Sequence, residues 1–438
     1  MRMVMTVNFA EAYFVKVRML RFAQVFLIAA MIFQAFPPLV LADQAHLSLG
    51  SALDPARMQN PQVAMARARV LQAEGMRTQA SLIPNPSLYA SSENTPLGGS
   101  QPFTFGNDTD DYVYLIQKVE LGGKRNRRVA FASENVRQMS IQSEVAMHQL
   151  LARVATAYWM AAGSEALDQL YQREVSTLDE IVDYNRARVK KGASAEADLI
   201  RIQLEGDRFK AQARLAAEQA RRSLIALYRE MGATAFPDSV VFTERLDDLA
   251  EVRPPDLETV LRDRPEMRAA REGFKQAEAN LDLQRANAVP DPQLMAGYKR
   301  FSGSGQFTGQ NTLFFGFQVP LPIFDRNQGQ IEAAQATVFG AKEAVTDQEI
   351  AIRAEVESAL SDYGSRREAL LKVLPQMAHQ AAESDQIAEG AYRLGGADIL
   401  RFLDASRMDI ETQVLFVQTL IDYHASVVNV ELVTGVLR

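Results

Sequence analysis

Residues 141–166 read IQSEVAMHQLLARVATAYWMAAGSEA, and they lie inside a span from about Arg125 to Lys190 that contains no proline and one glycine, Gly163. Apolar and small residues recur along this span at alternating spacings of four and three: Ile141, Val145, His148, Ala152, Ala155, Trp159, Ala162 and Ala166. Such spacing is typical of a heptad seam, and its small residues permit another helix to approach closely. At about 1.5 Å per residue, a helix of some 65 residues is about 100 Å long, which no compact globular domain requires.

A second seam with the same spacing follows in the C-terminal half of the chain: Ile331, Ala334, Val338, Ala341, Val345, Gln348 and Ile352. Pro375 falls within the long helix that this seam predicts, and its ring and missing N–H should bend that helix. Two interpretations of the bend stay open. It either helps the helices taper towards a closed end or is a local kink without a functional role.

The chain also repeats shorter landmarks, which indicates a tandem duplication. Ile83-Pro-Asn-Pro86 is matched 206 residues later by Val289-Pro-Asp-Pro292, and Arg188-Val-Lys-Lys-Gly192 is matched by Tyr392-Arg-Leu-Gly-Gly396 at an offset of 203 or 204. We therefore predict two structural repeats, residues 43–240 and residues 241–438. Each should contain a helix, two strands and a long α-helical hairpin.

Alternating sequence in each repeat predicts the strands. Residues 311–320 place Leu313, Phe315, Phe317 and Val319 on one face, and residues 112–120 show a noisier alternation. About ten residues of this kind are typical of a transmembrane β-strand, although the edge of a soluble sandwich is the alternative. Residues 95–100 and 302–305 are the expected turns.

The four predicted strands of one chain cannot close a barrel by themselves. An open edge in lipid leaves backbone groups unpaired, so closure requires other copies of the chain. Three copies would supply twelve strands.

The N-terminus predicts export. An apolar run from Phe22 to Ala42 follows Arg18 and Arg21, and it ends in small residues before Asp43, which is typical of a signal peptide over residues 1–42. A membrane anchor is the alternative, because the run approaches the roughly 20 residues that span a bilayer. A start at Met19 would bring the signal closer to the usual length. We expect no later segment to cross the inner membrane as a helix.

Composition excludes several classes of function. The chain has no cysteine, which excludes disulfides, thiolate metal sites, cysteine nucleophiles and a lipid on an N-terminal cysteine. Its net charge of −7 and lack of a basic stripe argue against nucleic acid as a partner. The four histidines, His46, His148, His379 and His424, form no metal-binding pair, and we expect His148 in the core. The sequence places no nucleophile, base and orienting group at a spacing typical of a catalytic site. We therefore expect no enzymatic activity and no cofactor or metal site.

Several motifs resemble those of TolC-like outer-membrane efflux proteins, over essentially the whole chain after residue 42. They are Ile83-Pro-Asn-Pro86, Val119-Glu-Leu-Gly-Gly-Lys-Arg-Asn-Arg-Arg128, Val319-Pro-Leu-Pro-Ile-Phe-Asp-Arg-Asn-Gln-Gly329, Leu374-Pro-Gln and Tyr392-Arg-Leu-Gly-Gly…Leu403-Asp-Ala405. The resemblance implies a mixed α and transmembrane β fold, which trimerises into a 12-stranded barrel and an α-helical tunnel. It implies the outer membrane of a Gram-negative bacterium, with the tunnel extending into the periplasm and outer-membrane lipid around the barrel.

The resemblance also implies a function and partners. The chain would be a passive exit duct, a homotrimer joined to a periplasmic adaptor (membrane fusion) protein and to an inner-membrane pump of the RND type. The Leu-Gly-Gly-Lys-Arg stretch is nearest to the branch that exports heavy-metal cations. Drug efflux and type I protein secretion are alternatives with the same architecture, and a soluble periplasmic coiled-coil scaffold is a remote one.

The tips of the two hairpins are the candidate functional site. Gly192, Gly395 and Gly396 should form the turns, because glycine accepts backbone angles closed to other residues. Asp198 and Asp404 resemble the family's tip aspartates, which draw the tunnel mouth closed, and Arg401 stands where some relatives have another acid. The expected latch therefore includes Arg–Asp pairs. The alternative is solvated charge at helix ends, with Asp198 and Asp398 favouring the positive helix N-termini.

Overall fold

The computed structural model describes residues 46–93, 102, 104, 109–249, 251–301 and 310–436. The predicted signal peptide over residues 1–42 and the turns at residues 95–100 and 302–305 lie outside the described residues. The chain divides into two compact units. The larger comprises residues 48–238 and 242–438, and it contains all the long elements. Two short strands, β1 (His46–Leu47) and β4 (Val241–Phe242), form a separate two-stranded sheet.

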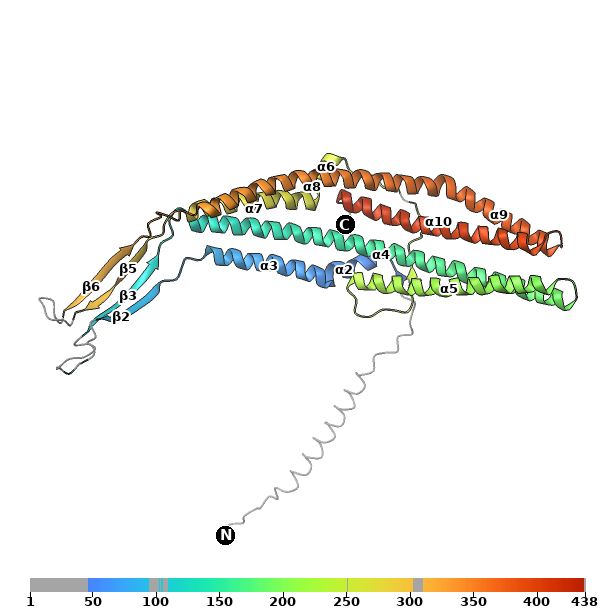
Figure 1. Ribbon diagram of the computed structural model, residues 1–438, viewed down its shortest axis with the longest axis horizontal. Coiled ribbons are helices and arrows are strands. Elements are labelled where there is room, and N and C mark those ends of the chain that lie inside the picture. The colour runs from blue at the N-terminus through green and yellow to red at the C-terminus, as the bar shows by residue number, and fades with distance from the viewer. Residues whose placement is uncertain are drawn as a thin grey trace, which may run out of the picture. The chain divides into compact units, whose positions relative to one another are not determined.

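The larger unit runs twice through one order of elements (Figure 1). The first passage is α2 (Leu49–Gln59), α3 (Pro61–Ser81), β2 (Ser87–Glu93), β3 (Asp110–Lys118), α4 (Lys124–Lys190) and α5 (Glu196–Met231). The second is α6 (Leu257–Asp263), α7 (Pro265–Asn287), β5 (Gln293–Arg300), β6 (Asn311–Gln318), α8 (Gln328–Glu368), η1 (Ala369–Val373), α9 (Leu374–Arg393) and α10 (Ile399–Thr434). Within this unit the strands lie at one end and the α4–α5 and α9–α10 turns at the other (Figure 1).

Helix α4 has 67 residues, and its predicted seam faces the protein. Ile141, Ala152, Ala155, Trp159 and Ala162 are buried, while Val145, Ala166 and His148 are half-buried. His148 is therefore not the core residue that its place on the seam predicted. The seam residues of α8 are likewise all buried or half-buried, and the buried ones are Ala334 and Ile352. The heptad spacing thus identified the packed faces of both helices.

The second long helix is interrupted where proline predicted a change. A π-helical segment, η1, ends at Val373, and α9 begins at Leu374 with Pro375 in its first turn. Proline has no N–H to donate to the preceding turn, and its ring crowds the carbonyl four residues earlier. The wider π-helical turn accommodates that loss, so α8, η1 and α9 replace one continuous helix.

Four strands form one antiparallel sheet in the order β2-β3-β5-β6. The central pair, β3 with β5, joins the two passages of the chain, and it pairs Leu115 with Ala296. The outer pairs align Leu115 with Leu88 and Ala296 with Phe315. Strand β6 ends at Gln318, so Val319 follows the strand rather than belonging to it. Strand β3 begins and ends two residues before the expected range of 112–120.

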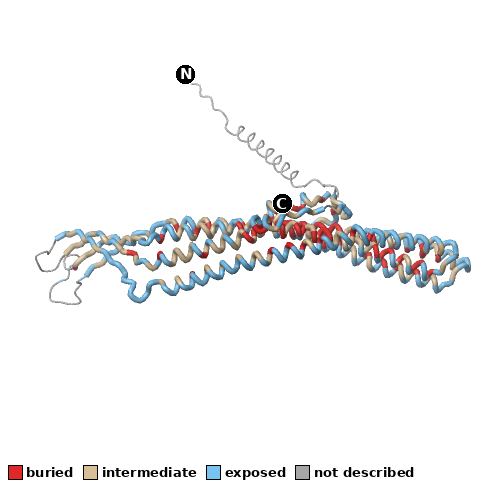
Figure 2. The backbone as a smooth tube through the Cα atoms, turned by 90° about the horizontal axis from the view of Figure 1, so that it is seen from above, coloured by how far each residue is buried: buried red, intermediate tan, exposed pale blue. Residues whose placement is uncertain are grey.

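Two apolar cores hold the helices together. One is built by α6, α7, α8 and α10 and includes Met267, Ile352 and Tyr423. The other is built by α4, α5, α9 and α10 and includes Ile181, Ile202 and Phe402; we call it the hairpin core. Figure 2 shows buried residues gathered in the middle of the larger unit and towards the helix turns. The strands are mainly exposed or half-buried (Figure 2).

Candidate functional site

One face of the sheet is apolar and exposed across all four strands. Leu313, Phe315 and Phe317 of β6 are 76%, 76% and 77% exposed. The strand register continues their face onto β5, β3 and β2 through Leu294, Ala296, Tyr298, Val113, Leu115, Leu88 and Ala90. Val319, just beyond the strand, is 39% exposed. Large apolar side chains in such a continuous row mark a surface that some other apolar phase or protein covers.

The opposite face carries aromatic and polar side chains. The rings of Tyr89 and Tyr114 stack with centroids 4.6 Å apart, and Phe314 follows at 5.2 Å from Tyr114. Gly297 lies between Tyr114 and Phe314 in the register, and a Cβ there would approach the Tyr114 Cα to 2.3 Å. The glycine therefore lets the tyrosine ring lie across the strand. Lys299 lies over the Tyr112 ring at 4.1 Å.

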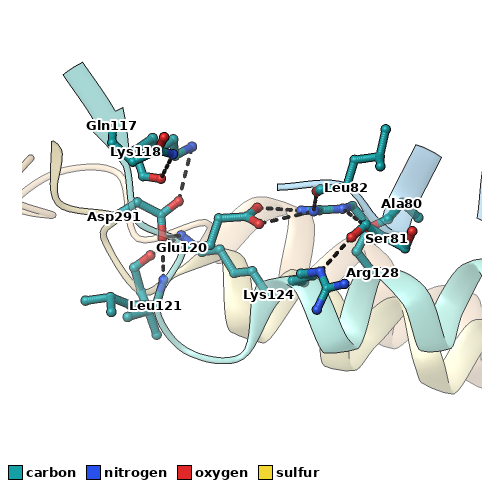
Figure 3. Close-up of polar contacts among 12 residues, drawn as sticks. Ala80, Ser81, Leu82, Gln117, Lys118, Glu120, Leu121, Lys124, Arg128 and Asp291 are labelled. Atoms are coloured by element: carbon teal, nitrogen blue, oxygen red, sulfur yellow. Dashed lines mark hydrogen bonds and ion pairs between the residues drawn. The ribbon is translucent and has the colours of Figure 1, made fainter. Parts of the chain in front are cut away.

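Asp291 anchors the junction between strands and helices (Figure 3). Its Oδ1 accepts from the Lys124 Nζ at 2.6 Å and from the Leu121 backbone N–H at 3.0 Å, and its Oδ2 lies 3.1 Å from the Lys118 Nζ. Burial alone would raise the pKa of Asp291, but these donors outweigh burial and lower that pKa. Lys124 also donates to the Val289 carbonyl, and its side chain is only 9% exposed. The charged pair thus fixes the start of α4 against the second repeat.

Arg128 performs a similar role towards the first repeat. Its guanidinium donates to both carboxylate oxygens of Glu120, to the Ala80 carbonyl at 2.9 Å and to the Leu82 carbonyl at 3.1 Å (Figure 3). The hydrogen bond from Arg128 lowers the pKa of Glu120 despite its partial burial. Arg128 therefore ties α4 to the end of α3.

These junction contacts were not predicted from the sequence. Gly122 and Gly123 form the turn from strand to helix with positive φ angles, but the cations that follow them had no predicted role. The sequence nevertheless contained a clue to the Lys124–Asp291 contact. The repeated landmark reads Pro-Asn-Pro in the first repeat and Pro-Asp-Pro in the second, so Asn85 corresponds to Asp291. The Lys124 ammonium lies against the second repeat, where this position is a charged aspartate.

The predicted tip residues occupy the two hairpin turns. Gly192 and Gly395 have φ angles of 70° and 80°, which side-chain-bearing residues rarely adopt, so glycine is needed at both. Gly396 follows, and its N–H donates to the Ala391 carbonyl at 2.8 Å. Asp398 caps α10 by accepting the Arg401 backbone N–H at 3.0 Å, which supports the helix-end interpretation for this aspartate.

Arg401 and Asp404 lie together in an open groove of about 580 Å³ between α9 and α10. Both are exposed, and Asp198 is half-buried in the first turn of α5. Among the described residues of one chain, none of these three forms an ion pair. The predicted Arg–Asp pairs are therefore absent within the chain described here, and Asp198 instead acts electrostatically on Tyr392.

Contacts that the sequence did not predict join the two hairpins close to their tips. The Tyr392 hydroxyl of α9 donates to Oδ1 of Asn185 in α4, which is fully buried. The Tyr184 hydroxyl donates to the Arg393 carbonyl at 3.3 Å, and the Arg188 guanidinium lies over both tyrosine rings at 5.6 Å and 5.7 Å. Burial raises the pKa of Tyr392. Tyr392 belongs to the repeated landmark, which was the available signal.

Among the residues that the structure describes, no group of three or more His, Asp or Glu side chains is arranged to hold a metal ion. No helix in this part of the chain combines the length and apolar character needed to cross a membrane.

Known proteins match this architecture along most of the chain. It is 24% identical over 410 residues to the cobalt-zinc-cadmium resistance protein CzcC of Cupriavidus metallidurans, covering 89% of this chain and 90% of that protein. It is 28% identical over 306 residues to the nickel and cobalt resistance protein CnrC of the same species, covering 68% and 71%. The fold is similar to the crystal structure of the Campylobacter jejuni CmeC outer membrane channel, with a TM-score of 0.75, 18% identity and coverage of 88% and 85%.

The family model described as "Outer membrane efflux protein" matches residues 52–233 and residues 257–436. These two segments contain the apolar sheet face, the charged junction and both hairpin tips. The chain therefore belongs to the outer membrane efflux protein family.

Proposed function

We propose that three copies of this chain close a twelve-stranded barrel in the outer membrane and a helical tunnel in the periplasm, which together form a passive exit duct. The observation that carries the proposal is the four-stranded sheet, which has one continuous apolar face and ends in the edge strands β2 and β6. In lipid, every unpaired backbone group at such an edge costs several kcal/mol. Pairing β2 of one copy with β6 of the next removes all edges in a closed ring.

The absence of cysteine from the chain permits a clean test of this closure. Cysteine pairs, one on β2 and one on β6, should give disulfide-linked species up to a trimer and none larger. The control pair is Ala90→Cys with Val113→Cys, because those positions are partners on β2 and β3 of one chain. It should form a disulfide without linking chains. An open-ended ladder from the β2–β6 pairs, or no link in any register, would reject the ring.

The repeats at residues 43–240 and 241–438 supply equal halves of each subunit in this proposal. The two segments matched by the family model support that division, as does the repeated order of elements. Each copy would contribute two hairpins to the tunnel. Their turns at Gly192 and at Gly395–Gly396 would meet a periplasmic adaptor protein, and an inner-membrane pump of the RND type would supply the energy. The duct itself catalyses no reaction.

The proposed cargo is heavy-metal cations, and the names of CzcC and CnrC support this choice. A strain lacking this protein should become more sensitive to zinc, cobalt, cadmium or nickel than to organic drugs. Re-expression of the wild-type chain should restore metal tolerance. Unchanged metal tolerance combined with raised drug sensitivity would instead support drug efflux through the same duct.

The tip residues would form the gate of the duct. Asp198, Arg401 and Asp404 have no ion-pair partner within the described part of their own chain, and each appears three times in a trimer. Arg401 of one copy could therefore pair with an aspartate of the next. Such exposed pairs contribute about 0.2–1 kcal/mol each, which threefold symmetry multiplies.

A further inference from the structure

Three carboxylates from three helices meet beside the hairpin core, away from the tips and the charged junction. They are Glu174 of α4, Asp385 of α9 and Asp409 of α10, which we call the carboxylate triad. The Ser406 hydroxyl, one turn before Asp409, donates to Glu174 at 3.1 Å and so ties α4 to this turn of α10. The charges of Asp385 and Asp409 act on Glu174, and that of Asp409 acts on Asp385.

We propose that the carboxylate triad is a proton-binding switch that sets how tightly the α9–α10 hairpin packs against α4. The inference rests on the proposed duct for its functional meaning, because the hairpin that it controls carries the proposed gate. The switch itself is a property of helix packing and is testable without any cargo.

Asp409 is buried, Glu174 and Asp385 are half-buried, and the triad has unmet hydrogen-bonding capacity. Asp409 is only 9% exposed, and its Oδ2 accepts from the Gln413 side chain while its Oδ1 accepts nothing from the described residues. Oδ1 of Asp385 is likewise buried without a donor. Among the described residues, Glu174 accepts one side-chain hydrogen bond, from the Ser406 hydroxyl at 3.1 Å. Ionised carboxylates need several donors, whereas a protonated carboxyl is neutral and can itself donate.

Three cations near the triad pair with other acids, whereas Arg401 of α10 lines the α9–α10 groove and forms no ion pair with the described residues. On α9, Arg393 pairs with Glu389 at 2.6 Å, and on α10, Arg407 pairs with Glu205 of α5 at 3.2 Å. Arg208 of α5 also faces Glu205, at 3.5 Å. The other titratable groups on the packed helices around the triad are Tyr171, His379, Glu383, Glu389, Asp404 and Glu411. Within the described part of the chain, no ion pair therefore offsets the negative charge of the triad.

The electrostatic consequence follows directly. Burial, and then repulsion from Asp385, Asp409 and Glu389, raises the pKa of Glu174 to about 7, against the lowering effect of the Ser406 hydrogen bond. Burial, with repulsion from Asp409 and Glu389, raises the pKa of Asp385 to about 6, and burial raises the pKa of Asp409. A group with a raised carboxyl pKa favours the packed state when protonated. That preference is lost as the pH rises from the ordinary carboxyl range to the raised pKa, because the loosened state ionises first. The window therefore runs from about pH 4 to pH 7.

The triad has a packed route to the tips. Ile410 follows Asp409 directly, and it belongs to the hairpin core together with Tyr392, whose hydroxyl donates to Asn185. Loosening of α9–α10 at the triad therefore weakens the packing that supports the hairpin turns. A periplasm near neutral pH would hold the hairpin looser than an acidified one.

Hydrogen exchange of the purified full-length protein tests the switch. Amides of α9 and α10 should show opening that increases roughly tenfold or more from pH 5 to pH 8, after correction for intrinsic exchange. The combined variant Glu174→Gln, Asp385→Asn and Asp409→Asn should show no such increase. The matched control is Glu180→Gln, Glu383→Gln and Glu411→Gln, three exposed acids on the same helices, and it should behave as wild type.

Two results would overturn the proposal. One is wild-type exchange that does not change between pH 5 and pH 8, and the other is a combined variant that keeps the wild-type pH dependence. If the combined variant fails to fold, Asp385→Asn alone serves, because Asp385 is only half-buried; it should reduce the pH dependence. The proposed duct is tested separately by the β2–β6 cysteine cross-links, because their formation does not depend on the triad.

Discussion

Asp291 combines two charged donors and one backbone donor at a place where the chain passes between strand and helix. We expect Asp291→Asn to destabilise the protein by about 3 kcal/mol, because it leaves the buried Lys124 ammonium without its carboxylate. The measurement is denaturant or thermal unfolding in detergent. The control is Asp282→Asn, which breaks an exposed pair with Arg127 at 2.7 Å and should cost about 0–1 kcal/mol. Equal losses of stability in the two variants would show that the junction pair stabilises the fold no more than an exposed pair does.

The same residue gives a pH dependence of opposite sign to that of the triad. The pKa of Asp291 is lowered in the folded chain, so its contribution to stability is present above the ordinary aspartate pKa and is lost as the pH falls below it. Asp291→Asn should therefore remove part of the acid sensitivity of unfolding below about pH 4. If the stability of this variant falls with acid as steeply as that of wild type, Asp291 does not contribute to the acid sensitivity.

Phe315 tests the assignment of the sheet faces one side chain at a time. Its ring is exposed on the apolar face, whereas Gln318 lies on the other face of β6. We expect Phe315→Arg to reduce membrane insertion by about 2–4 kcal/mol if the residue lies near the bilayer midplane, because arginine is costly in lipid. Gln318→Arg should be tolerated, and the two are compared by the yield of membrane-inserted protein. Equal tolerance at both positions would mean that the faces are assigned wrongly.

At the scale of elements, helices α4 and α10 pack closely at Gly163. A Cβ at this position would lie 2.1 Å from Cγ1 of Ile421. Gly163→Ala should therefore destabilise the protein by about 1–3 kcal/mol, although alanine is the better helix former. Gly364→Ala in α8 is the control, because no described residue beyond its own helical turn lies within 4 Å of the added Cβ, and we expect no loss there.

The single tryptophan of the chain provides the readout for this variant. Trp159 lies one turn before Gly163, and its ring stacks on His424 of α10 with centroids 3.6 Å apart. Separation of the two helices should change the Trp159 emission in Gly163→Ala and leave it unchanged in Gly364→Ala. A variant with wild-type emission and stability would show that Ile421 simply changes rotamer to make room.

Local sequence predicted the long elements because their causes are local. The proline-free heptad stretch predicted α4 to within one residue of its observed start, and alternation identified the exposed face of β6. The contacts of the candidate site could not be predicted in this way. Lys124 meets Asp291, and Asn185 meets Tyr392, across more than 160 residues of sequence, and only the packing of one repeat against the other brings them together. The half-buried state of His148 has the same origin, since heptad spacing does not say how much of each turn a neighbour covers.

At the scale of the whole molecule, much of the apolar surface of one chain still needs a partner. Phe339 and Ile350 of α8 are 67% and 62% exposed, and Leu71 of α3 is 66% exposed. Burial contributes roughly 25 cal/mol for each Å² of apolar surface, so surfaces of this kind favour association along the helices as well as along the strands. In the proposed trimer, each hairpin tip would lie beside its symmetry copies, where interactions weak in one chain are repeated around the axis.

The gate prediction belongs to this scale, because it depends on symmetry copies. Asp198 and Asp404 form no ion pair within the described part of one chain, so in the proposed gate each would take its partner from a neighbouring copy. Asp198→Ala combined with Asp404→Ala should raise the conductance of the protein in planar bilayers. It should also admit large antibiotics to cells that lack the adaptor. The control is Asp398→Ala, which removes only the cap of α10, costs about 0.5–2 kcal/mol of stability and should leave the conductance unchanged. The double variant could instead assemble normally and keep the wild-type conductance and antibiotic exclusion. In that case the charges at these helix ends only stabilise the helices, and the contact between Tyr392 and Asn185 becomes the better candidate for the latch.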